Sequence, residues 1–382
     1  MNRSLLQRNA SACCPISCRF QYNYRIHVNI MNENRLREIL AKISDVHIAV
    51  VGDFFLDRYW KIAPELDEPS IETGLMAYQI VERWGGPGAA GTITNNLAAL
   101  GVGKIHAVGF LGKDGEGNEL AGHLDAIGAA RTYMIETRLR ATPCYTKPMR
   151  NGIEMNRFDI KNHTETPKEV EDELISSIHM VACHVKAIII MDQVSEDNCG
   201  VLTDRVRNAL IQLSCKNSSL LVYADSRKRI GLYNEMIVKC NEREILEVFG
   251  LYDGRSPKFE TVKQCGYKLA DKTKHPVFIT LGERGQLVVY PRRSRKKIIH
   301  VPALRVKDEI DICGVGDASS SAIIASLCSG ATHKEAVLIG NLAASVTIRK
   351  IGQTGTASQK EILSAYEEYA KQNNTHKQPI LE

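Results

Sequence analysis

Short apolar runs alternate along most of this chain with segments whose apolar residues recur every three or four positions. The apolar runs predict buried β-strands, and the second kind of segment predicts helices that pack on a sheet. Strands are predicted at residues 47–51, 104–110, 187–191, 220–224 and 277–281, and helices at 34–43, 89–100 and 117–127. Strands that alternate with helices predict an α/β fold, with a doubly wound, mostly parallel sheet flanked by helices.

Two stretches break this alternation. Residues 57–81 and 143–158 carry segments of period two and several turn residues. Within the second stretch, Asn151-Gly152 stands between two strand-like arms, which is typical of a tight hairpin. We expect these stretches to form a small β-sheet lid that lies over the edge of the main sheet and excludes water from it.

The ends of the chain differ from the part between them. Residues 1–31 contain four arginines and no acid, and they lack the apolar stretch of a secretory signal. Their composition is mildly similar to an organelle transit peptide, but we interpret them as a disordered or non-native extension. The predicted organisation is therefore one domain over residues 32–365, followed by a polar tail over 366–382.

Charge and cysteine usage exclude several classes of function. The formal charge is only +5, and the one dense basic run, residues 292–297, lies between two strand-like segments, so we interpret it as a solvated hairpin loop. The eleven cysteines show no metal-site spacing, which favours reduced thiols and a cytoplasmic protein. No apolar run approaches the roughly 18 residues of a membrane span. Neither a nucleic-acid nor a membrane partner is expected.

The segment from Asp311 to Asp317, Asp-Ile-Cys-Gly-Val-Gly-Asp, carries the most specific chemistry. Its two glycines precede an acid and a run with helical apolar spacing that Gly330 ends. Consecutive backbone N–H groups at a helix N-terminus bind phosphate well. A carboxylate at such an anion hole suggests a proton acceptor beside a phosphoryl group. The alternative from these residues alone is a glycine-rich turn with Asp317 as the helix N-cap.

Polar residues also follow several of the predicted strands. Asp192, Asp225 and Gly282 each come directly after one of them, and Asp53 follows the first strand with only Gly52 between. Because ligands of parallel sheets bind at the carboxyl ends of the strands, these residues predict a shared polar rim.

Four motifs together make the chain similar to a known family. They are Gly85–Gly91, Asn241–Glu244, Thr280–Gly285 and Asp311–Asp317. In this order they resemble the sugar-site glycines, the N-x-x-E segment, the T-x-G-x-x-G loop and the D-x-x-G-x-G-D signature of the ribokinase-like (PfkB) carbohydrate kinases. The resemblance covers residues 46–358.

Within that family, the chain looks most like the heptose 7-phosphate kinase domain. The likeness rests on Gly52-Asp53 followed by Leu56–Trp60, and on Arg157–Asp159 and Lys350–Gly355. It implies ATP-dependent transfer of the γ-phosphate to a hydroxyl of a sugar or sugar phosphate, with heptose 7-phosphate as the named acceptor. It also implies a homodimer formed through the lid.

The resemblance assigns roles to individual residues. Asp317 would accept the proton of the attacking hydroxyl while the N–H groups of Gly314, Val315 and Gly316 hold the phosphate. Residues for ATP would be Asn241, Glu244, Thr280, Gly282, Gly285 and Asn341. Residues for the sugar would be Asp53, Gly86, Gly88, Thr92 and Arg157. Glu244 and Asp225 would hold Mg²⁺ through water, and Asp311 would help to bind a monovalent cation such as K⁺.

Three of these assignments have plain alternatives. Asn341 is also compatible with a polar residue on the exposed side of a helix, Arg157 with a salt bridge on the lid surface, and Asp311 with an acid at the end of a strand.

The chain also departs from the family pattern. Ala89 replaces a glycine, Thr92 replaces the expected sugar-binding asparagine, and Val315 and Ala318 replace the usual alanine and threonine of the signature. These changes allow a second hypothesis, a catalytically impaired regulatory relative that binds sugar and nucleotide. A nicotinamide-dependent enzyme is disfavoured, because Gly52-Asp53-Phe-Phe-Leu stands where G-x-G-x-x-G would follow the first strand.

Overall fold

The computed structural model describes residues 30–352 and 354–375. Residues 1–29 of the predicted extension and 376–382 of the predicted tail lie outside this part. Met31 is buried, and its carbonyl accepts a hydrogen bond of 2.6 Å from the hydroxyl of Tyr366. The folded part therefore extends past both predicted boundaries, and its last helix includes the residues 366–375 that we expected to form a polar tail.

A nine-stranded, mostly parallel sheet forms the centre of the described part of the chain. In spatial order it consists of β16 (Ile298–Val301), β15 (Gln286–Val289), β14 (Val277–Thr280), β13 (Ile237–Asn241), β12 (Leu221–Ser226), β11 (Ala187–Asp192), β1 (His47–Gly52), β6 (Lys104–Gly112) and β7 (Ala130–Thr137). Only β15 and β16 run antiparallel to their neighbours. The doubly wound α/β prediction is confirmed.

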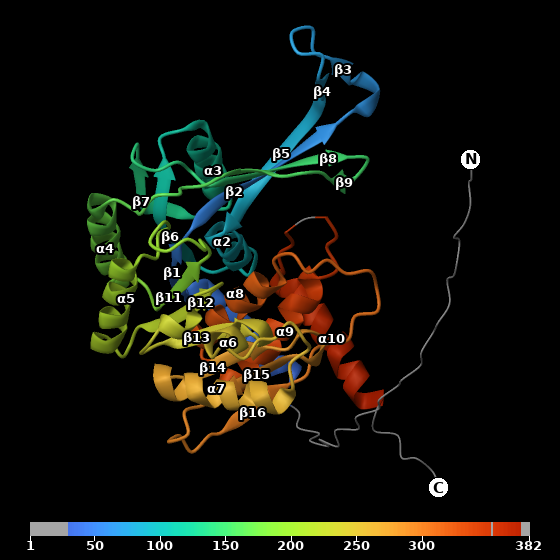
Figure 1. Cartoon of the computed structure of the whole chain (residues 1–382). Helices are drawn as coiled ribbons and strands as arrows, with labels where there is room; N and C mark the ends of the chain where they lie inside the picture. The colour runs from blue at the N-terminus through green and yellow to red at the C-terminus, as the bar shows by residue number, and fades with distance from the viewer. Residues whose placement is uncertain (1–29, 353, 376–382) are drawn as a thin grey trace, which may run out of the picture.

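Helices cover both faces of this sheet (Figure 1). Alternate residues of β1 point to opposite sides, since Ile48 and Val50 belong to one apolar core and Ala49 and Val51 to the other. The first core includes α1 (Glu33–Ala41), α2 (Ala90–Ala99), α3 (Gly115–Ala126), α8 (Val315–Cys328), α9 (His333–Thr347) and α10 (Gln359–Thr375). The second includes α4 (Lys168–Ala182), α5 (Asp204–Lys216), α6 (Glu242–Val248) and α7 (Phe259–Thr273). Short 3₁₀ turns cover Lys42–Asp45, Pro64–Leu66, Ile230–Leu232 and Gly282–Arg284.

The predicted lid is a second, smaller sheet that stands away from the main body (Figure 1). It is ordered β10 (Phe158–Ile160), β8 (Cys144–Arg150), β2 (Phe54–Ile62) and β5 (Ile80–Ala89), with β9 (Ile153–Glu154) beside β8 and the small pair β3 (Glu68–Pro69) and β4 (Met76–Ala77) at its far end. The hairpin prediction is confirmed, because Asn151 and Gly152 form the β8–β9 turn with φ of 52° and 78°.

The lid joins the main sheet without a linker. Only Asp53 separates β1 from β2, and β5 passes directly into α2. The two junctions lie side by side, since Phe54 pairs with Ala89. Ala89 has φ 52° and ψ −115°, a backbone conformation that suits glycine. Alanine therefore stands at a strained position where the family usually has a glycine.

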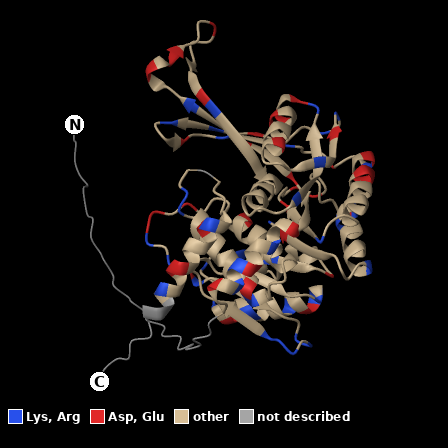
Figure 2. Cartoon of the chain, turned by 180° about the vertical axis from the view of Figure 1, so that it is seen from behind, with Lys and Arg blue, Asp and Glu red and all other residues tan. Residues whose placement is uncertain are grey.

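Basic and acidic residues are interspersed along the elements drawn in Figure 2. The basic run at residues 292–297 lies in the loop between β15 and β16, as predicted. The cysteines in the described residues are free thiols, and no helix there is long and apolar enough to cross a membrane.

Candidate active site

The predicted anion hole lies where α8 begins. Gly314 precedes the helix with φ +71°, and a Cβ there would lie 2.6 Å from Cγ2 of Thr354. Only glycine fits both the conformation and the space. The N–H of Val315 lies 3.5 Å from the carbonyl of Ile312, whereas the amides of Gly314 and Gly316 have no hydrogen-bond partner in the described part of the chain. Two of the three predicted donors are therefore free to bind an anion.

Asp317 lies in the first turn of α8, within a group of ionisable side chains. Burial and the charges of Asp225 and Asp57 together raise the pKa of Asp317 to about 7, against the opposing effect of Lys239. A carboxyl group with a pKa near neutrality can accept a proton and release it again at physiological pH, as a general base must.

Lys239 is a component of this site that the sequence did not reveal. Its ammonium lies 2.8 Å from Oδ2 of Asp225, which also accepts a 3.1 Å hydrogen bond from the hydroxyl of Ser320. A Cβ on Gly316 would lie only 3.1 Å from this ammonium, so the cation adjoins the anion hole. Burial lowers the pKa of Lys239, but the charges of Asp225 and Glu244, together with the hydrogen bond to Asp225, raise it by more, so the side chain stays protonated. A buried cation at this point can stabilise a bound phosphate.

Strand register brings the nucleotide motifs together. Asp225 on β12 pairs with Lys239 on β13, and Asn241 on β13 pairs with Thr280 on β14. Asn241 and Glu244 form a capping box at the start of α6, with side-chain to backbone bonds of 2.8 and 2.7 Å. Burial, together with the neighbouring Asp225, raises the pKa of Glu244 to about 6.

The T-x-G-x-x-G segment forms a tight loop after β14. Gly282 and Gly285 have φ of +59° and +88°, and a Cβ on Gly285 would lie 2.1 Å from the carbonyl oxygen of Val301. The amide of Asn341 donates to the carbonyls of Val301 (3.0 Å) and Pro302 (3.2 Å). Asn341 is buried, so the alternative of an exposed helical residue is wrong. It supports the segment against which the glycine loop packs.

The oxygen ligands near the anion hole fit Mg²⁺ bound jointly with a nucleotide. The described residues contain no cluster of three or more His, Cys, Asp or Glu side chains that could hold a metal alone. Asp225 and Glu244 each use one carboxylate oxygen in the hydrogen bonds above, which leaves the other available. This matches Mg²⁺, which keeps much of its water and shares one or two carboxylates with substrate phosphates.

Asp311 connects two loops. Its two carboxylate oxygens accept 2.9 Å hydrogen bonds from the N–H groups of Cys313 and Gly352. No strand includes it, so the alternative of a strand-terminal acid is wrong. Its role beside a monovalent cation stays a prediction.

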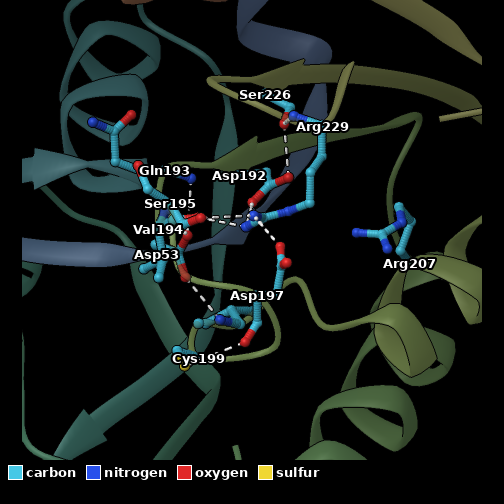
Figure 3. A network of polar contacts seen from close by, with 12 residues as sticks. Asp53, Asp192, Gln193, Val194, Ser195, Asp197, Cys199, Arg207, Ser226 and Arg229 are labelled. Atoms are coloured by element: carbon cyan, nitrogen blue, oxygen red, sulfur yellow. Dashed lines mark hydrogen bonds and ion pairs between the residues drawn. The ribbon is translucent and has the colours of Figure 1, made fainter. Parts of the chain in front are cut away.

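Asp53 is the leading sequence candidate for binding sugar hydroxyls, but its carboxylate is already hydrogen-bonded to backbone N–H groups of the protein (Figure 3). Its carboxylate accepts hydrogen bonds from the N–H groups of Gln193 (2.9 Å), Val194 (2.9 Å) and Val201 (2.7 Å). Burial raises the pKa of Asp53 to about 6, helped by Asp192. A buried carboxylate that already accepts three backbone hydrogen bonds is a structural clamp, which corrects the sequence-based assignment.

Asp57 takes the position that we had expected for Asp53. It lies on β2, and a Cβ on Gly88 would be 2.6 Å from its Oδ2. Lys147 Nζ lies 3.9 Å from Oδ1. Asp57 also lies near enough to raise the pKa of Asp317, and burial raises its own pKa. The Leu56–Trp60 segment is the sequence signal that includes Asp57, but Asp53 follows the strand more closely and is therefore the stronger candidate from sequence alone.

Two other predicted sugar residues lie near Asp57, since Gly86 pairs with it across β2 and β5 and the charge of Arg157 acts on its carboxylate. A Cβ on Gly86 would point into open space. Thr92 lies beside the anion hole, because its Cγ2 would be 3.6 Å from a Cβ built on Gly314. Arg157 makes the lid salt bridge that we considered, with bonds of 2.6 and 2.8 Å to Asp159, and its guanidinium lies 4.1 Å from the ring centre of Tyr145.

Comparison with known proteins is consistent with this geometry. A family model described as pfkB family carbohydrate kinase matches residues 62–360. The chain belongs to the pfkB family of carbohydrate kinases. This is a family of phosphotransferases whose acceptor is an alcohol group. The ribokinase-like prediction is confirmed at the level of family and fold.

Its curated relatives include the bifunctional protein HldE of Azorhizobium caulinodans, 27% identical over 341 residues, and that of Gluconacetobacter diazotrophicus, 25% identical over 328 residues. These alignments cover 87% and 84% of this chain, but only 67% and 64% of the relatives. The chain thus spans about two thirds of their length.

Solved structures share the fold. Phosphofructokinase-2 from Escherichia coli, in complex with substrates and products, superposes with a TM-score of 0.65 at 17% identity, covering 85% of this chain and 99% of that one. Ribokinase from Arabidopsis thaliana, complexed with ribose and ATP, gives 0.62 at 17% identity, covering 84% and 98%.

Proposed function

We propose that this pfkB-family kinase transfers the γ-phosphate of ATP, with Mg²⁺, to a hydroxyl of a sugar or sugar phosphate. The observation that supports this most directly is Asp317, a carboxyl group with a pKa near 7, placed beside free backbone donors at the start of α8.

Each group has a role in the proposed transfer. Asp57 accepts hydrogen bonds from acceptor hydroxyls and orients one of them toward Asp317, which takes its proton. The N–H groups of Gly314 and Gly316 and the ammonium of Lys239 hold the moving phosphate. Asn241, Thr280, Gly282 and Gly285 line the nucleotide, with Asn341 behind them. Glu244 and Asp225 would hold Mg²⁺ together with the nucleotide phosphates, and the ion would supply positive charge against those phosphates.

Heptose 7-phosphate is the acceptor that we propose, because HldE proteins are among the relatives and because the Leu56–Trp60 segment resembles that group. A monovalent cation near Asp311 is proposed on the resemblance. A structure of Escherichia coli phosphofructokinase-2 in complex with potassium is among the proteins of similar fold.

An ATP-consumption screen over sugars and sugar phosphates tests the proposal. We expect turnover that requires Mg²⁺ and is faster with heptose 7-phosphate than with fructose 6-phosphate. Equal rates with the two phosphates would overturn the heptose assignment. No consumption with any acceptor would overturn the kinase proposal.

Activity should depend on pH through the proton acceptor. Because Asp317 acts in its deprotonated form and its pKa is raised to about 7, kcat/KM for the acceptor should rise with pH up to about 7 and then level off. Well below that pH it should fall about tenfold per unit. Initial rates from pH 5 to 9 would measure this, and a flat profile across pH 6–8 would contradict the assigned base.

The second candidate is a regulatory relative that binds both ligands without turnover. Ala89, Thr92 and Val315 favour it, because each departs from the family pattern at the site. Calorimetry with ATP and the same sugars would distinguish it, since this candidate requires binding without transfer.

We also propose that two copies pair through their lids. The lid exposes several large apolar side chains, which are Leu66, Ile71, Leu75, Met76, Tyr78, Ile80, Val81 and Trp84. Covering them with the lid of a second copy would remove this surface from water.

A further inference from the structure

A cavity of about 330 Å³ lies between the lid and the segment 193–201. It opens at the carboxyl ends of β1 and β11, which are neighbours in the sheet. From β1 the main sheet continues to β6 on one side, and from β11 it continues to β12 on the other. Open α/β sheets bind ligands at such a switch point.

One wall of the cavity is rigidly held (Figure 3). Besides the Asp53 clamp, the guanidinium of Arg229 donates to the carbonyls of Ser195 and Val194. The same guanidinium pairs with Asp192 at 3.1 Å, and Asp192 also accepts from Ser226 and Tyr233. The 193–201 segment is thus shaped before any ligand arrives, which reduces the entropic cost of binding.

The charges that line this cavity favour an anion. Its cations are Arg157, Lys161 and Arg227, and its acids are Asp53 and Glu196. Asp53 is already satisfied by three backbone N–H groups. Arg157 pairs with Asp159, but Lys161 and Arg227 make no ion pair with any residue that the structure describes. Two cations therefore remain for a ligand.

The cavity adjoins the acceptor site. Phe55 and Tyr145 line it, with ring centres 5.1 Å apart, and Tyr145 pairs with Asp57 across β2 and β8. Because alternate residues of a strand share a face, Phe55 and Asp57 lie on the same side of the lid, about 7 Å apart along β2. That separation suits a sugar whose reacting hydroxyl lies near Asp57 and whose far end enters the cavity.

We propose that this cavity is a subsite for a phosphate group already present on the acceptor, with Lys161 and Arg227 as its charge partners. The proposal rests on the proposed kinase function and narrows its acceptors to sugar phosphates. Charge-assisted hydrogen bonds to a phosphate make the subsite discriminate against the same sugar without phosphate.

The test compares sugar phosphates with their free sugars in the full chain. Binding of heptose 7-phosphate, heptose, fructose 6-phosphate and fructose is measured by calorimetry, and transfer is measured where it occurs. Arg227→Met and Lys161→Met should each weaken binding of the preferred sugar phosphate about 10- to 100-fold. Binding of ATP and of the free sugar should stay within about twofold. The matched control is Lys228→Met, which removes an exposed neighbouring cation outside the cavity. It should change the affinity for neither the sugar phosphate nor the free sugar.

Two results would overturn the subsite. One is that no sugar phosphate binds more tightly than its free sugar. The other is that Arg227→Met weakens binding of the sugar phosphate and of the free sugar by the same factor. Phosphate-selective binding without transfer would support the subsite while refuting the kinase proposal. A failure of the subsite and a failure of the kinase proposal therefore give different results. Thermal unfolding of each variant confirms that the loss does not come from misfolding.

Discussion

Asp317→Asn should lower kcat by about 10²- to 10⁴-fold while nucleotide affinity stays close to that of the wild type. The amide cannot accept the hydroxyl proton, whereas the backbone donors at Gly314 and Gly316 remain. The variant should also fold. The folded protein raises the pKa of Asp317 from 3.8 to about 7, so it holds this proton more tightly than the unfolded chain does. Ionisation therefore costs stability as pH rises through that interval, and asparagine avoids the cost.

Steady-state kinetics and ATP titration at pH 8 measure the effect. Asp308→Asn provides the control, because Asp308 lies on the preceding loop with a side chain that is 75% exposed, and its change should leave kcat within about twofold. Turnover of Asp317→Asn within a factor of about three of the wild type would rule out this residue as the proton acceptor.

Lys239→Met should reduce the free energy of unfolding by about 3–5 kcal/mol. Its ammonium is the buried partner of Asp225, and Asp317 and Glu244 lie nearby. Removing this ammonium takes away the cation that acts on Asp317 and Glu244 among the described residues, and the pKa of Asp317 should rise further because Lys239 lowers it. Urea unfolding at pH 7 measures the loss of stability.

Two further variants check the cause of that loss. Adding Asp225→Asn to Lys239→Met should restore part of the stability, because one uncompensated charge is then removed. Lys61→Met, which breaks an exposed lid pair with Glu82, should cost less than about 1 kcal/mol. A Lys239→Met loss as small as that of Lys61→Met would show that the buried pair does not hold this site together.

The sequence predicts the elements well because their apolar periods are regular. Strand β1 and the Asn151-Gly152 turn come within a residue of their expected places, since each depends on local pattern. Asp225 is also predictable, because strand ends of a parallel sheet share one edge, whereas Glu244 is predicted only by the resemblance of Asn241–Glu244 to a family motif.

What the sequence does not reveal depends on contacts between distant segments. Asp53 and Asp57 are both acids near the end of β1, and only the fold shows three N–H groups from 193–201 meeting the first of them. Lys239 stands in a short β-run, where nothing local indicates that its ammonium reaches the start of α8. Lys161 and Arg227 come from separate segments that meet only at the cavity.

The junction at Asp53 and Ala89 also determines how the lid can move. Both long strands of the lid leave the main body at this paired point, and the carboxylate of Asp53 is fastened to the 193–201 segment. Any rotation of the lid about this junction would pivot close to Asp57, the proposed acceptor residue on the same strand. A wide swing of the β3–β4 tip corresponds to only a small displacement of the acceptor, so reactant alignment can survive while the entrance opens and shuts.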